Sequence, residues 1–582
     1  MMKRRQTREV YVGNVGVGGN NPVRIQSMTT SDTRDVAATI EQVMRLSDQG
    51  CEIVRVTVQG VKEALACELI KNGLLQKGYN IPLVADIHFF PKAAFQAIEF
   101  VDKVRINPGN FVDKRASFKV IEYDDAIYAN ELLRIEEKFA PLVEKCKSLN
   151  KPIRIGTNHG SLSDRIMNRY GDTPAGMVES AFEFARICRK YDFHDIIFSM
   201  KASNPLVMIE AYRLLVSEMD KLNWDYPLHL GVTEAGSGED GRVKSAVGIG
   251  SLLLDGLGDT IRVSLTEDPW LEIDPCRRLV TLAEEKIISE GWCVYKHQER
   301  IVTPSNSFSI HPKGAVILQP KLGEDLDSIL DHNEPLTKID ALVGCNYKET
   351  PNINPTPLHL AQFQVNDPEV ILVEDDKWEA LSKFKPSLIL VDFKSDRVAT
   401  CRRFFAWLKK KQINTPVILS FSYDCSTEDL PIFAAAECGS LLCDGLGEGI
   451  WLRGPYQTSL LRNLSFNILQ STRRRIIKTD FISCPSCGRT LFDLQEVTKR
   501  IQERTDHLAG VKIAIMGCIV NGPGEMADAD FGYVGSRPGM IDLYLGKKCV
   551  EKNIPFAQAD DRLVALIKSN GKWLEPKGGE TE

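Results

Sequence analysis

Several features are absent from this sequence of 582 residues, and each absence excludes a class of protein. No apolar run approaches the roughly 18 to 20 residues that span a bilayer, which excludes a membrane-spanning helix. The first residues, MMKRRQTREV, lack the apolar core of a secretory signal. The net charge of -6 is small for this length, so neither a nucleic acid nor an anionic membrane is required as a partner. We expect a cytoplasmic protein, and the start of the chain favours a bacterial one.

The fifteen cysteines lack the paired spacing of a disulfide framework. Most stand singly in apolar segments, as Cys51, Cys67 and Cys188 do. This distribution is typical of reduced thiols in a cytosolic protein. Only the group near the C-terminus has a spacing that indicates a specific chemistry.

The first 300 residues alternate short β-type runs with longer segments of helical periodicity, which predicts a parallel α/β fold. Eight β-type runs occur in this order: VRIQSM, EIVRVTV, PLVADIH, KVRINPG, PIRIGTN, DIIFSMKA, LHLGVTEA and TIRVSL. Eight strands close a (β/α)8 TIM barrel, whose usual size is about 250 residues. We therefore predict an N-terminal barrel domain over residues 1–298.

Polar side chains stand at the ends of these runs, where a barrel forms its active-site mouth. The cations among them are Arg55, Arg105, Arg154, Lys201 and Arg262. The other polar residues at these ends include Asp86, His88, Asn107, Asn110, Asn158, Thr233, Glu234 and Ser264. Any one Arg fits a surface position or a pair with a neighbouring carboxylate. Several that converge would repel one another unless an anion compensated them, so we predict a small, multiply anionic substrate and favour phosphate over carboxylate.

The α/β alternation resumes between residues 299 and 475. Its β-type runs are GAVILQP, DALVGCNY, EVILVED, PSLILVDF, PVILSFSY and GSLLCDG. They predict a second, incomplete barrel-like domain inserted into the chain, which we expect to be structural. Its expected strand ends are acidic or neutral and offer no phosphate site: Asn346, Asp375, Asp392 and Asp424.

A near repeat connects these two regions. LLLDGLGDTI from Leu252 and LLCDGLGEGI from Leu441 are identical at seven of ten positions and lie 189 residues apart. The shared DGLG is typical of a tight turn in which glycine adopts a positive φ. We expect Leu452 to stand in the second copy where the first has Arg262. The second copy is therefore predicted to keep the backbone turn but not the polar side chains of the anion site.

The last segment, residues 476–582, contains ISCPSCGRTLFD and GCIVNGPGE. Cys484 and Cys487 form a C-x2-C pair, and Cys518 and Glu525 follow. Thiolates in this spacing suit either zinc or an iron–sulfur cluster. A structural zinc site would normally have a fourth Cys or a His near Cys518, which the segment lacks. Three thiolates and one oxygen ligand favour a cluster with one distinct iron, although the spacing alone leaves zinc open. The basic run STRRRIIK before the pair fits a solvated linker better than a nucleic-acid patch.

These motifs resemble the 4-hydroxy-3-methylbut-2-enyl diphosphate synthases of the methylerythritol phosphate route to isoprenoids. The resemblance rests on RIQSMTT, ADIHF, KVRINPGN, RIGTNHGSL, GVTEAG, GDTIRVSLTEDP, ISCPSCGRTLFDLQ and GCIVNGPGE. The long insert is similar to the three-domain, plant-like form of that family. The resemblance implies an iron–sulfur oxidoreductase that opens 2-C-methyl-D-erythritol 2,4-cyclodiphosphate and expels water, with two electrons from a ferredoxin or flavodoxin.

The resemblance also implies roles for individual residues. The diphosphate would be bound by Arg55, Arg105, Asn107, Arg154, Asn158, Lys201, Arg262 and Ser264. Asp86 and Glu234 would lie near the carbon skeleton, with Glu234 as the candidate proton donor. One 4Fe-4S cluster per chain would be held by Cys484, Cys487, Cys518 and Glu525, with Glu525 as the exchangeable ligand. The insert would occupy the place of a partner barrel, so that one chain closes its own site.

Two other functions remain compatible with parts of the sequence. A pterin-type barrel that transfers methyl groups would explain the anion-binding mouth, with the C-terminal cysteines structural. A zinc-ribbon domain on a catalytically silent barrel would make the chain a binding module. Both leave the missing fourth Cys or His unexplained.

Overall fold

The computed structural model divides into two compact units. The barrel unit comprises residues 4–245, 257–280 and 478–582, and the insert unit comprises residues 1–3, 246–256 and 281–477. The ranges that the structure describes are 4–113, 123–285, 294–303, 310–321, 323–324, 335–343, 361–363, 369–374, 378–383, 386–519, 522–526 and 528–576. None of the helices in these ranges is long and apolar enough to cross a membrane.

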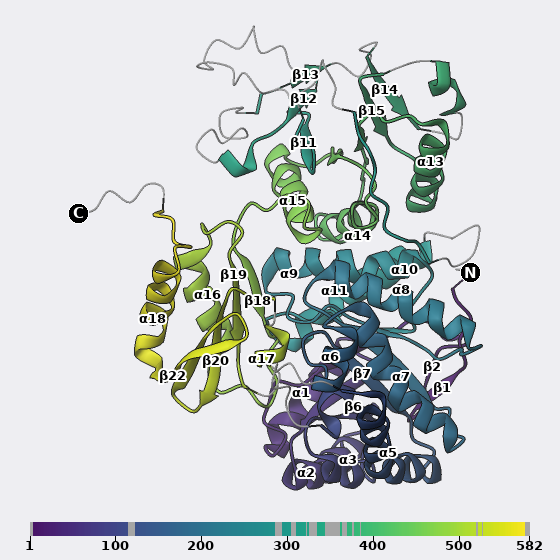
Figure 1. The fold of residues 1–582 in the computed structure, drawn as a ribbon, viewed down its shortest axis with the longest axis vertical. Coiled ribbons are helices and arrows are strands. Elements are labelled where there is room, and N and C mark those ends of the chain that lie inside the picture. The colour runs from purple at the N-terminus through teal and green to yellow at the C-terminus, as the bar shows by residue number, and fades with distance from the viewer. Residues whose placement is uncertain are drawn as a thin grey trace. The chain divides into compact units, whose positions relative to one another are not determined.

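The N-terminal part of the barrel unit is the predicted TIM barrel (Figure 1). Its eight parallel strands are β3 (Arg24–Met28), β4 (Ile53–Val58), β5 (Leu83–Ile87), β6 (Lys103–Ile106), β7 (Ile153–Asn158), β8 (Ile196–Lys201), β9 (His229–Leu230) and β10 (Thr260–Ile261). They lie in the order β8-β7-β6-β5-β4-β3-β10-β9, and a parallel bridge between Phe198 and Leu228 joins the two ends. All eight predicted runs therefore form strands. A short hairpin of β1 (Val10–Val12) and β2 (Val15–Val17) precedes them.

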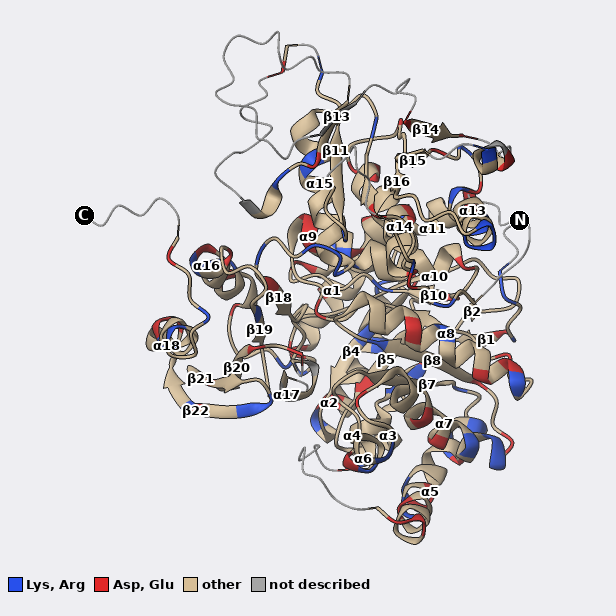
Figure 2. Cartoon of the chain, turned by 45° about the horizontal axis from the view of Figure 1, so that its top comes forward, with Lys and Arg blue, Asp and Glu red and all other residues tan. Residues whose placement is uncertain are grey.

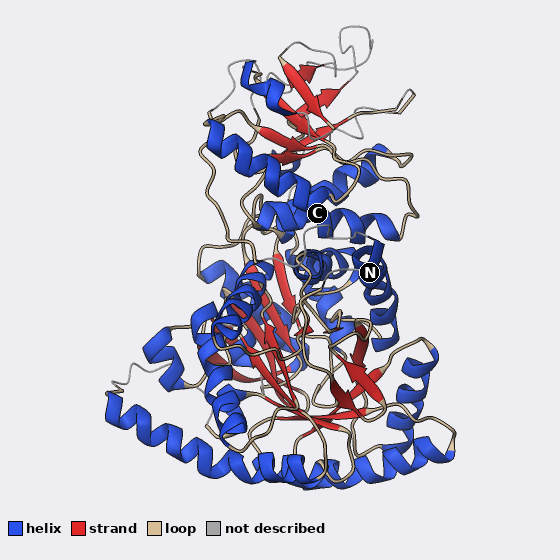
Figure 3. Cartoon of the chain, turned by 90° about the vertical axis from the view of Figure 1, so that its right-hand side faces the viewer, coloured by secondary structure: helices blue, strands red, loops and turns tan. Residues whose placement is uncertain are grey.

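Helices enclose these strands, as the red arrows inside blue coils in Figure 3 show. They are α1 (Val36–Asp48), α2 (Val61–Gln76), α3 (Pro91–Ala97), α4 (Pro108–Phe111), α5 (Asp125–Ser148), α6 (Asp164–Tyr170), α7 (Pro174–Lys190), α8 (Pro205–Lys221), α9 (Gly238–Ser245), η2 (Pro269–Glu272) and α11 (Ile273–Glu285). Side-chain caps fix several starting points: Asp35, Asp124, Thr173 and Asn204 each accept a hydrogen bond from a backbone N–H of the first turn. Cations and carboxylates are intermixed on the outer helices, for example on α5 and α7 (Figure 2).

The C-terminal domain, residues 478–576, is a five-stranded sheet covered by helices. Its strands are β18 (Asp480–Ser483), β19 (Lys512–Met516), β20 (Phe531–Arg537), β21 (Met540–Leu545) and β22 (Lys548–Pro555), with α16 (Leu494–Thr505), α17 (Gly522–Glu525) and α18 (Phe556–Ser569). The first three strands are parallel and the last two pairs antiparallel. Alternation divides β19 between two cores: Ile513 and Ile515 enter one, Ala514 and Met516 the other.

The insert unit contains a second parallel sheet, half of a barrel. Its strands are β11 (Ala315–Leu318), β12 (Ala341–Val343), β13 (Ala361–Phe363), β14 (Val370–Val373), β15 (Leu388–Val391), β16 (Val417–Leu419) and β17 (Gly449–Ile450), in the order β13-β12-β11-β17-β16-β15-β14. Its helical elements are η1 (Ala246–Gly250), α10 (Ser251–Leu254), η3 (Pro335–Thr337), η5 (Trp378–Lys383), α13 (Arg397–Lys411), α14 (Asp429–Cys443) and α15 (Thr458–Ser471).

The repeated decapeptide is the end of a helix, a turn and the start of a strand. Our interpretation of GSLLCDG as a strand is wrong. Leu441 and Leu442 lie in α14, and the strand that follows is β17, which begins at Gly449. A short apolar run fits a buried helix end as well as a buried strand, which explains the error. The predicted turn is confirmed: Gly256 and Gly445 have φ of 78° and 83°.

The duplication extends beyond the decapeptide. β9 and β16, and β10 and β17, are each separated by the same 189 residues. At this offset the second copy has Trp451, not Leu452, where the first has Arg262, and Arg453 where the first has Ser264. The expected acidic mouth is also wrong for Asp392, whose buried carboxylate is paired with Arg453 and Lys394. The expected strand ends at Asn346 and Asp375 lie outside the described residues.

One guanidinium connects the two copies of the repeat within the insert unit. Arg402 Nη2 lies 2.8 Å from Asp255 Oδ1 and 2.7 Å from Asp444 Oδ2. These two aspartates are the equivalent residues of DGLG in each copy, and both are fully buried. Close helix packing surrounds the pair, since a Cβ on Gly439 of α14 would come within 2.7 Å of Val247 Cγ2 in η1.

Replacing Arg402 by Met should destabilise the insert unit by about 3 to 5 kcal/mol, because removing one partner leaves buried carboxylates uncompensated. Urea unfolding, monitored by tryptophan fluorescence, measures the change. Arg403→Met is the control, since Arg403 is only half-buried and should change stability by no more than about 0.5 kcal/mol. Equal unfolding midpoints for the two variants would contradict this role of Arg402.

Candidate active site

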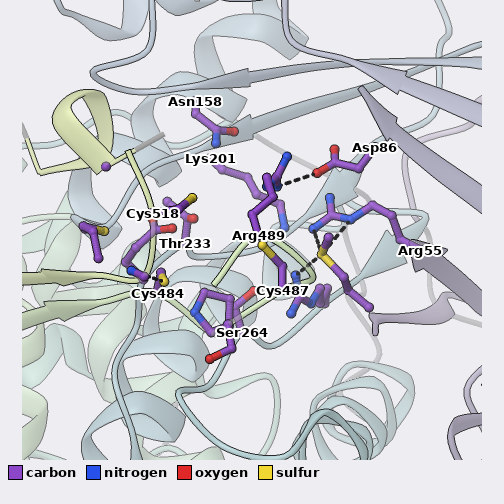
Figure 4. Close-up of a pocket in the computed structure, with 18 of the residues that line it drawn as sticks. Arg55, Asp86, Asn158, Lys201, Thr233, Ser264, Cys484, Cys487, Arg489 and Cys518 are labelled. Carbon is purple, nitrogen blue, oxygen red and sulfur yellow. Dashed lines mark hydrogen bonds and ion pairs between the residues drawn. The ribbon is translucent and has the colours of Figure 1, made fainter. Parts of the chain in front are cut away.

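The C-terminal ends of the barrel strands and two loops of the C-terminal domain enclose one pocket of about 80 Å³ (Figure 4). The predicted barrel residues that line it are Arg55, Asp86, Arg105, Asn158, Lys201, Glu234, Arg262 and Ser264. The opposite wall includes all three predicted cysteine ligands, Cys484, Cys487 and Cys518. The structure therefore brings together the two groups of residues that the sequence separates by more than 200 positions.

Two predicted site residues, Arg154 and Asn107, are not among the described residues that line the pocket, and for a third, Glu525, the structure does not describe the side chain. Arg154 is fully buried beneath the pocket and donates a hydrogen bond from Nη1 to Ser199 Oγ at 3.1 Å. Asn107 caps α4, where its Oδ1 accepts a hydrogen bond from the Gly109 N–H at 3.2 Å. The side chain of Glu525 lies outside the described residues, although its backbone ends α17.

Asp86 at the end of β5 is the centre of the polar network. Its Oδ1 accepts from Arg105 Nη1 at 2.9 Å, and its Oδ2 accepts from Arg489 Nη2 at 3.1 Å. Although burial raises the pKa of Asp86, Arg55 and Arg105 hold it well below its ordinary value. Burial lowers the pKa of the neighbouring His88 to about 3, so this imidazole is neutral. Asp86 is therefore a permanent carboxylate between cations of two domains.

Arg262 has a carboxylate of its own. Its Nε and Nη2 donate to the two oxygens of Glu272 at 3.0 and 2.9 Å, a bidentate pair buried on both sides. Ser27 Oγ donates to the same Glu272 at 2.7 Å. Glu272 therefore fixes the orientation of Arg262 at the pocket wall. Sequence reasoning did not single out Glu272, because it lies in η2 rather than at a strand end.

The other cations of the mouth are less compensated. Arg55 donates to Met28 Sδ at 3.3 and 3.0 Å, a weak acceptor, and two nitrogens of Arg154 have no hydrogen-bond partner. Within the described ranges, neither of these residues nor Lys201 pairs with a carboxylate. Burial lowers the pKa of Lys201 well below its ordinary value, and repulsion by Arg55 and Arg154 lowers it further. Such a site favours an anion that supplies the missing charge.

Glu234 follows β9 in a left-handed backbone conformation, with φ of 49°. A residue other than glycine is strained there, and such strain is concentrated at functional positions. The side chain is 3% exposed and faces the pocket. The conformation places a carboxyl group on the pocket wall.

The cysteines are positioned by neighbouring parallel strands. Cys484 follows β18 directly, and Cys518 follows β19 with one residue between. The Gly517 N–H donates to Cys484 Sγ at 3.4 Å, and Cys487 N–H donates to Thr490 Oγ1 at 3.0 Å. Ser486 between the paired cysteines has φ of 64°, a second left-handed residue that reverses the loop. The loop therefore turns both thiols of the pair towards the pocket.

The thiols form a suitable donor set for a metal centre. Burial raises the pKa of Cys484 well above its ordinary value, and the neighbouring Cys487 and Cys518 raise it further. Thiols that repel one another as thiolates are stabilised by a cationic iron or zinc centre, which displaces their protons. No three His, Cys, Asp or Glu side chains of the described residues are grouped closely enough to share one metal ion. Ligands of a cluster bind different iron atoms and can be further apart. None of the thirteen cysteines in the described ranges forms a disulfide bond.

Direct contacts connect the barrel to the C-terminal domain of the same chain. Thr266 Oγ1 donates to the Ser483 carbonyl at 3.2 Å, and Ala235 forms a parallel bridge with Ser483. Lys244 Nζ lies 3.1 Å from Asp480 Oδ1. These contacts lie beside the pocket, so one chain supplies both of its walls.

Arg489 is the functional residue that sequence reasoning missed. It lies two residues after Cys487, is 8% exposed and lines the pocket from the C-terminal domain. The available signal was an arginine two residues after the C-x2-C pair. Only the structure shows that it meets Asp86, because the two are 403 residues apart.

Comparisons with known proteins identify the same two parts of the chain, the barrel and the C-terminal domain. Two family models match, the GcpE TIM-barrel domain at residues 7–277 and the GcpE protein C-terminal domain at residues 480–569. A solved dihydropteroate synthase from Burkholderia cenocepacia is 13% identical, covers 48% of this chain and 97% of its own, and has a TM-score of 0.32. That likeness is too low to support the pterin-type alternative.

Curated relatives match the whole chain. The 4-hydroxy-3-methylbut-2-en-1-yl diphosphate synthase (flavodoxin) of Protochlamydia amoebophila is 59% identical over 99% of this chain and 97% of its own. The chloroplastic, ferredoxin-named enzyme of Oryza sativa is 49% identical over 99% of this chain and 88% of its own. The flavodoxin-named enzyme of Chlamydia abortus is 48% identical over 99% and 98%. The chain belongs to the GcpE family of 4-hydroxy-3-methylbut-2-en-1-yl diphosphate synthases.

Proposed function

We infer that this chain converts 2-C-methyl-D-erythritol 2,4-cyclodiphosphate to 4-hydroxy-3-methylbut-2-enyl diphosphate, a step of isoprenoid biosynthesis. The reaction opens the ring, takes up two electrons and releases water. The observation that supports it is the pocket in which five cationic side chains and two carboxylates face three cysteines. Cations suit a diphosphate, and thiolates suit a centre that delivers electrons.

We propose that the diphosphate lies against Arg55, Lys201 and Arg262, with Arg105, Asn158 and Ser264 beside them. Arg55 and Lys201 face the pocket without carboxylate partners among the described residues, so a diphosphate would provide the compensating charge. Arg154 contributes from below as a buried positive charge. Asn107 acts on the site through the α4 turn that it caps.

We propose that Cys484, Cys487, Cys518 and Glu525 hold one 4Fe-4S cluster per chain. When bound, the cluster supplies the electrons one at a time and a Lewis-acidic iron next to the substrate. The protein holds three thiols on two adjacent strand ends, and Arg489 places a positive charge beside them. The buried walls exclude water from the reacting carbons.

Glu234 is proposed to protonate the hydroxyl that leaves as water. Asp86 is ionised and engaged by Arg105 and Arg489, which makes it a positioning residue rather than a proton donor. We therefore assign proton transfer to Glu234, the other carboxyl group among the described residues that line the pocket. The electron donor is proposed to be a reduced flavodoxin or ferredoxin, since the relatives are named for these carriers.

The proposed domain organisation is a catalytic barrel (1–298), a structural insert (299–475) and a cluster domain (476–582). The insert keeps the backbone pattern of the barrel, but at Arg262 and Ser264 it has Trp451 and Arg453. The polar side chains of the insert therefore differ from those that line the active-site mouth.

The central test is an anaerobic assay of cyclodiphosphate consumption with a chemical reductant. We expect turnover by the brown, iron-loaded protein and none after chelation of the iron. A colourless protein that contains one zinc ion and does not turn over would overturn the proposal.

Lys201→Met should stabilise the substrate-free protein by about 1 to 3 kcal/mol, because it removes a buried ammonium group that its neighbours repel. The gain should shrink as the pH rises towards 10.5, the ordinary pKa of lysine, because the unfolded chain then also carries a neutral amine. Urea unfolding at several pH values measures it.

Inorganic pyrophosphate should raise the melting temperature of the wild type more than that of Lys201→Met. Lys221→Met, at the exposed end of α8, is the control and should behave as the wild type. A destabilised Lys201→Met that still responds fully to pyrophosphate would remove Lys201 from the anion site.

Glu234→Gln should lower kcat by roughly 10² to 10⁴, because the amide cannot donate the proton. Its visible absorption spectrum and its substrate Kd should remain those of the wild type. Glu239→Gln, at an exposed position of α9, provides the matched control. A wild-type rate for Glu234→Gln would exclude this residue as the acid.

Mixing Arg262→Leu with Cys518→Ser should not restore activity, because each chain supplies both walls of its own pocket. Arg262→Leu removes a wall residue of the barrel, and Cys518→Ser removes one of the opposite wall. The mixture is assayed against each variant alone at the same total concentration. Recovery of activity would show that the sites are completed between chains.

A further inference from the structure

A second cavity lies against the cysteine loop. It is a groove of about 560 Å³ that opens at the surface between the loops after β3 and β4, η2 and the residues 486–495. Ser486, Cys487 and Arg489 line both this groove and the active-site pocket. The loop that presents Cys487 to the pocket is therefore also the inner wall of the groove.

The groove is lined mainly by polar side chains. The half-buried Leu491 and Phe492 add apolar surface, although the Phe492 ring also packs against Tyr533 and Phe556 of the C-terminal domain. The exposed residues of its rim are Arg34, Gln59, Asp268, Asp493 and Gln495. Weak electron-transfer complexes use small contact surfaces, and the rims of transient interfaces are polar.

We propose that this groove is where reduced flavodoxin docks and passes electrons to the centre held by the cysteines. The inference rests on the proposed function and deepens it by naming the surface of the electron donor. Electron transfer slows steeply with distance, and a partner in the groove would lie against the loop that carries Cys487. Leu491 and Phe492 are a minor part of the lining, so the contact would be largely polar. Flavodoxin is chosen because the 59% identical relative is named for it.

The charges of the rim predict a weak and only moderately salt-dependent complex. Asp268 and Asp493 are opposed by Arg34, which is itself paired with Asp32. No long-range attraction of one sign follows from this arrangement. Specificity would come from the shape of the groove and from hydrogen bonds of its polar lining.

Bulk placed in the groove tests the proposal. Gln59→Trp and Gln495→Trp fill opposite sides of the rim without replacing any residue that lines the active-site pocket. For the anaerobic holoenzyme we expect the Kd of oxidised flavodoxin by calorimetry, and the KM of reduced flavodoxin, to rise about tenfold, equivalent to 1.4 kcal/mol. The rate with methyl viologen radical and the KM of the cyclodiphosphate should remain within twofold of the wild type. Gln558→Trp, exposed on α18 of the same domain, is the control and should change neither Kd nor KM.

Each other outcome has a distinct meaning. Unchanged flavodoxin Kd and KM in both groove variants would overturn the docking site. An equal loss of the rate with methyl viologen would show that the substitutions act on the active-site pocket. This result would also overturn the docking site. Impairment with ferredoxin but not with flavodoxin would overturn the choice of partner. A wild type that binds flavodoxin but does not turn over with viologen would instead overturn the proposed function.

Discussion

Positive charge removed from water is the constraint on which the rest of this structure depends. Arg55, Arg154 and Lys201 are buried at one barrel mouth with no carboxylate partner among the described residues. Their mutual repulsion opposes folding of the empty protein, and an anionic ligand relieves it. The same charge that weakens the ligand-free state therefore favours the binding of an anion, which we propose is the diphosphate. The remaining side chains of the strands are largely apolar, as in β4, where Ile53, Val54, Val56 and Val58 are fully buried around Arg55.

Two of the buried carboxylates near the mouth, Glu272 and Asp86, compensate this charge in different ways. Glu272 binds Arg262 with both oxygens and holds it in one orientation. Asp86 instead divides its oxygens between Arg105 of the barrel and Arg489 of the C-terminal domain. Where the C-terminal domain covers the pocket, Arg489 adds a cation to the site. The same Arg489 gives the cysteine loop a contact with the carboxylate of Asp86. The contacts of Asp86 therefore balance charge at the mouth and also attach the C-terminal domain to the barrel.

The fold was predictable from sequence where local patterns decide it. The eight barrel strands were identified because β-type runs and helical segments alternate at short range. Cys484 and Cys487, which line the pocket, were singled out because C-x2-C is a local spacing. The end of α14 was misassigned because the apolar run at Leu441 has no period that distinguishes helix from strand. Arg154 and Asn107 were expected in the pocket because sequence gives the strand end but not the depth of a side chain. The contact of Arg489 with Asp86 depends on how the C-terminal domain packs against the barrel. No local sequence pattern encodes this packing.

The arginine shared by the two copies of the repeat has a consequence for the history of such chains. Arg402 belongs to the insert, yet it compensates both Asp444 of its own copy and Asp255 of the first. The segment 246–256 that carries Asp255 belongs to the same compact unit as the insert. Excising residues 299–475 would therefore remove Arg402 and also the helix α14 against which η1 packs. A shorter chain would have to accommodate both the apolar surface of η1 and the carboxylate of Asp255 that the deletion uncovers.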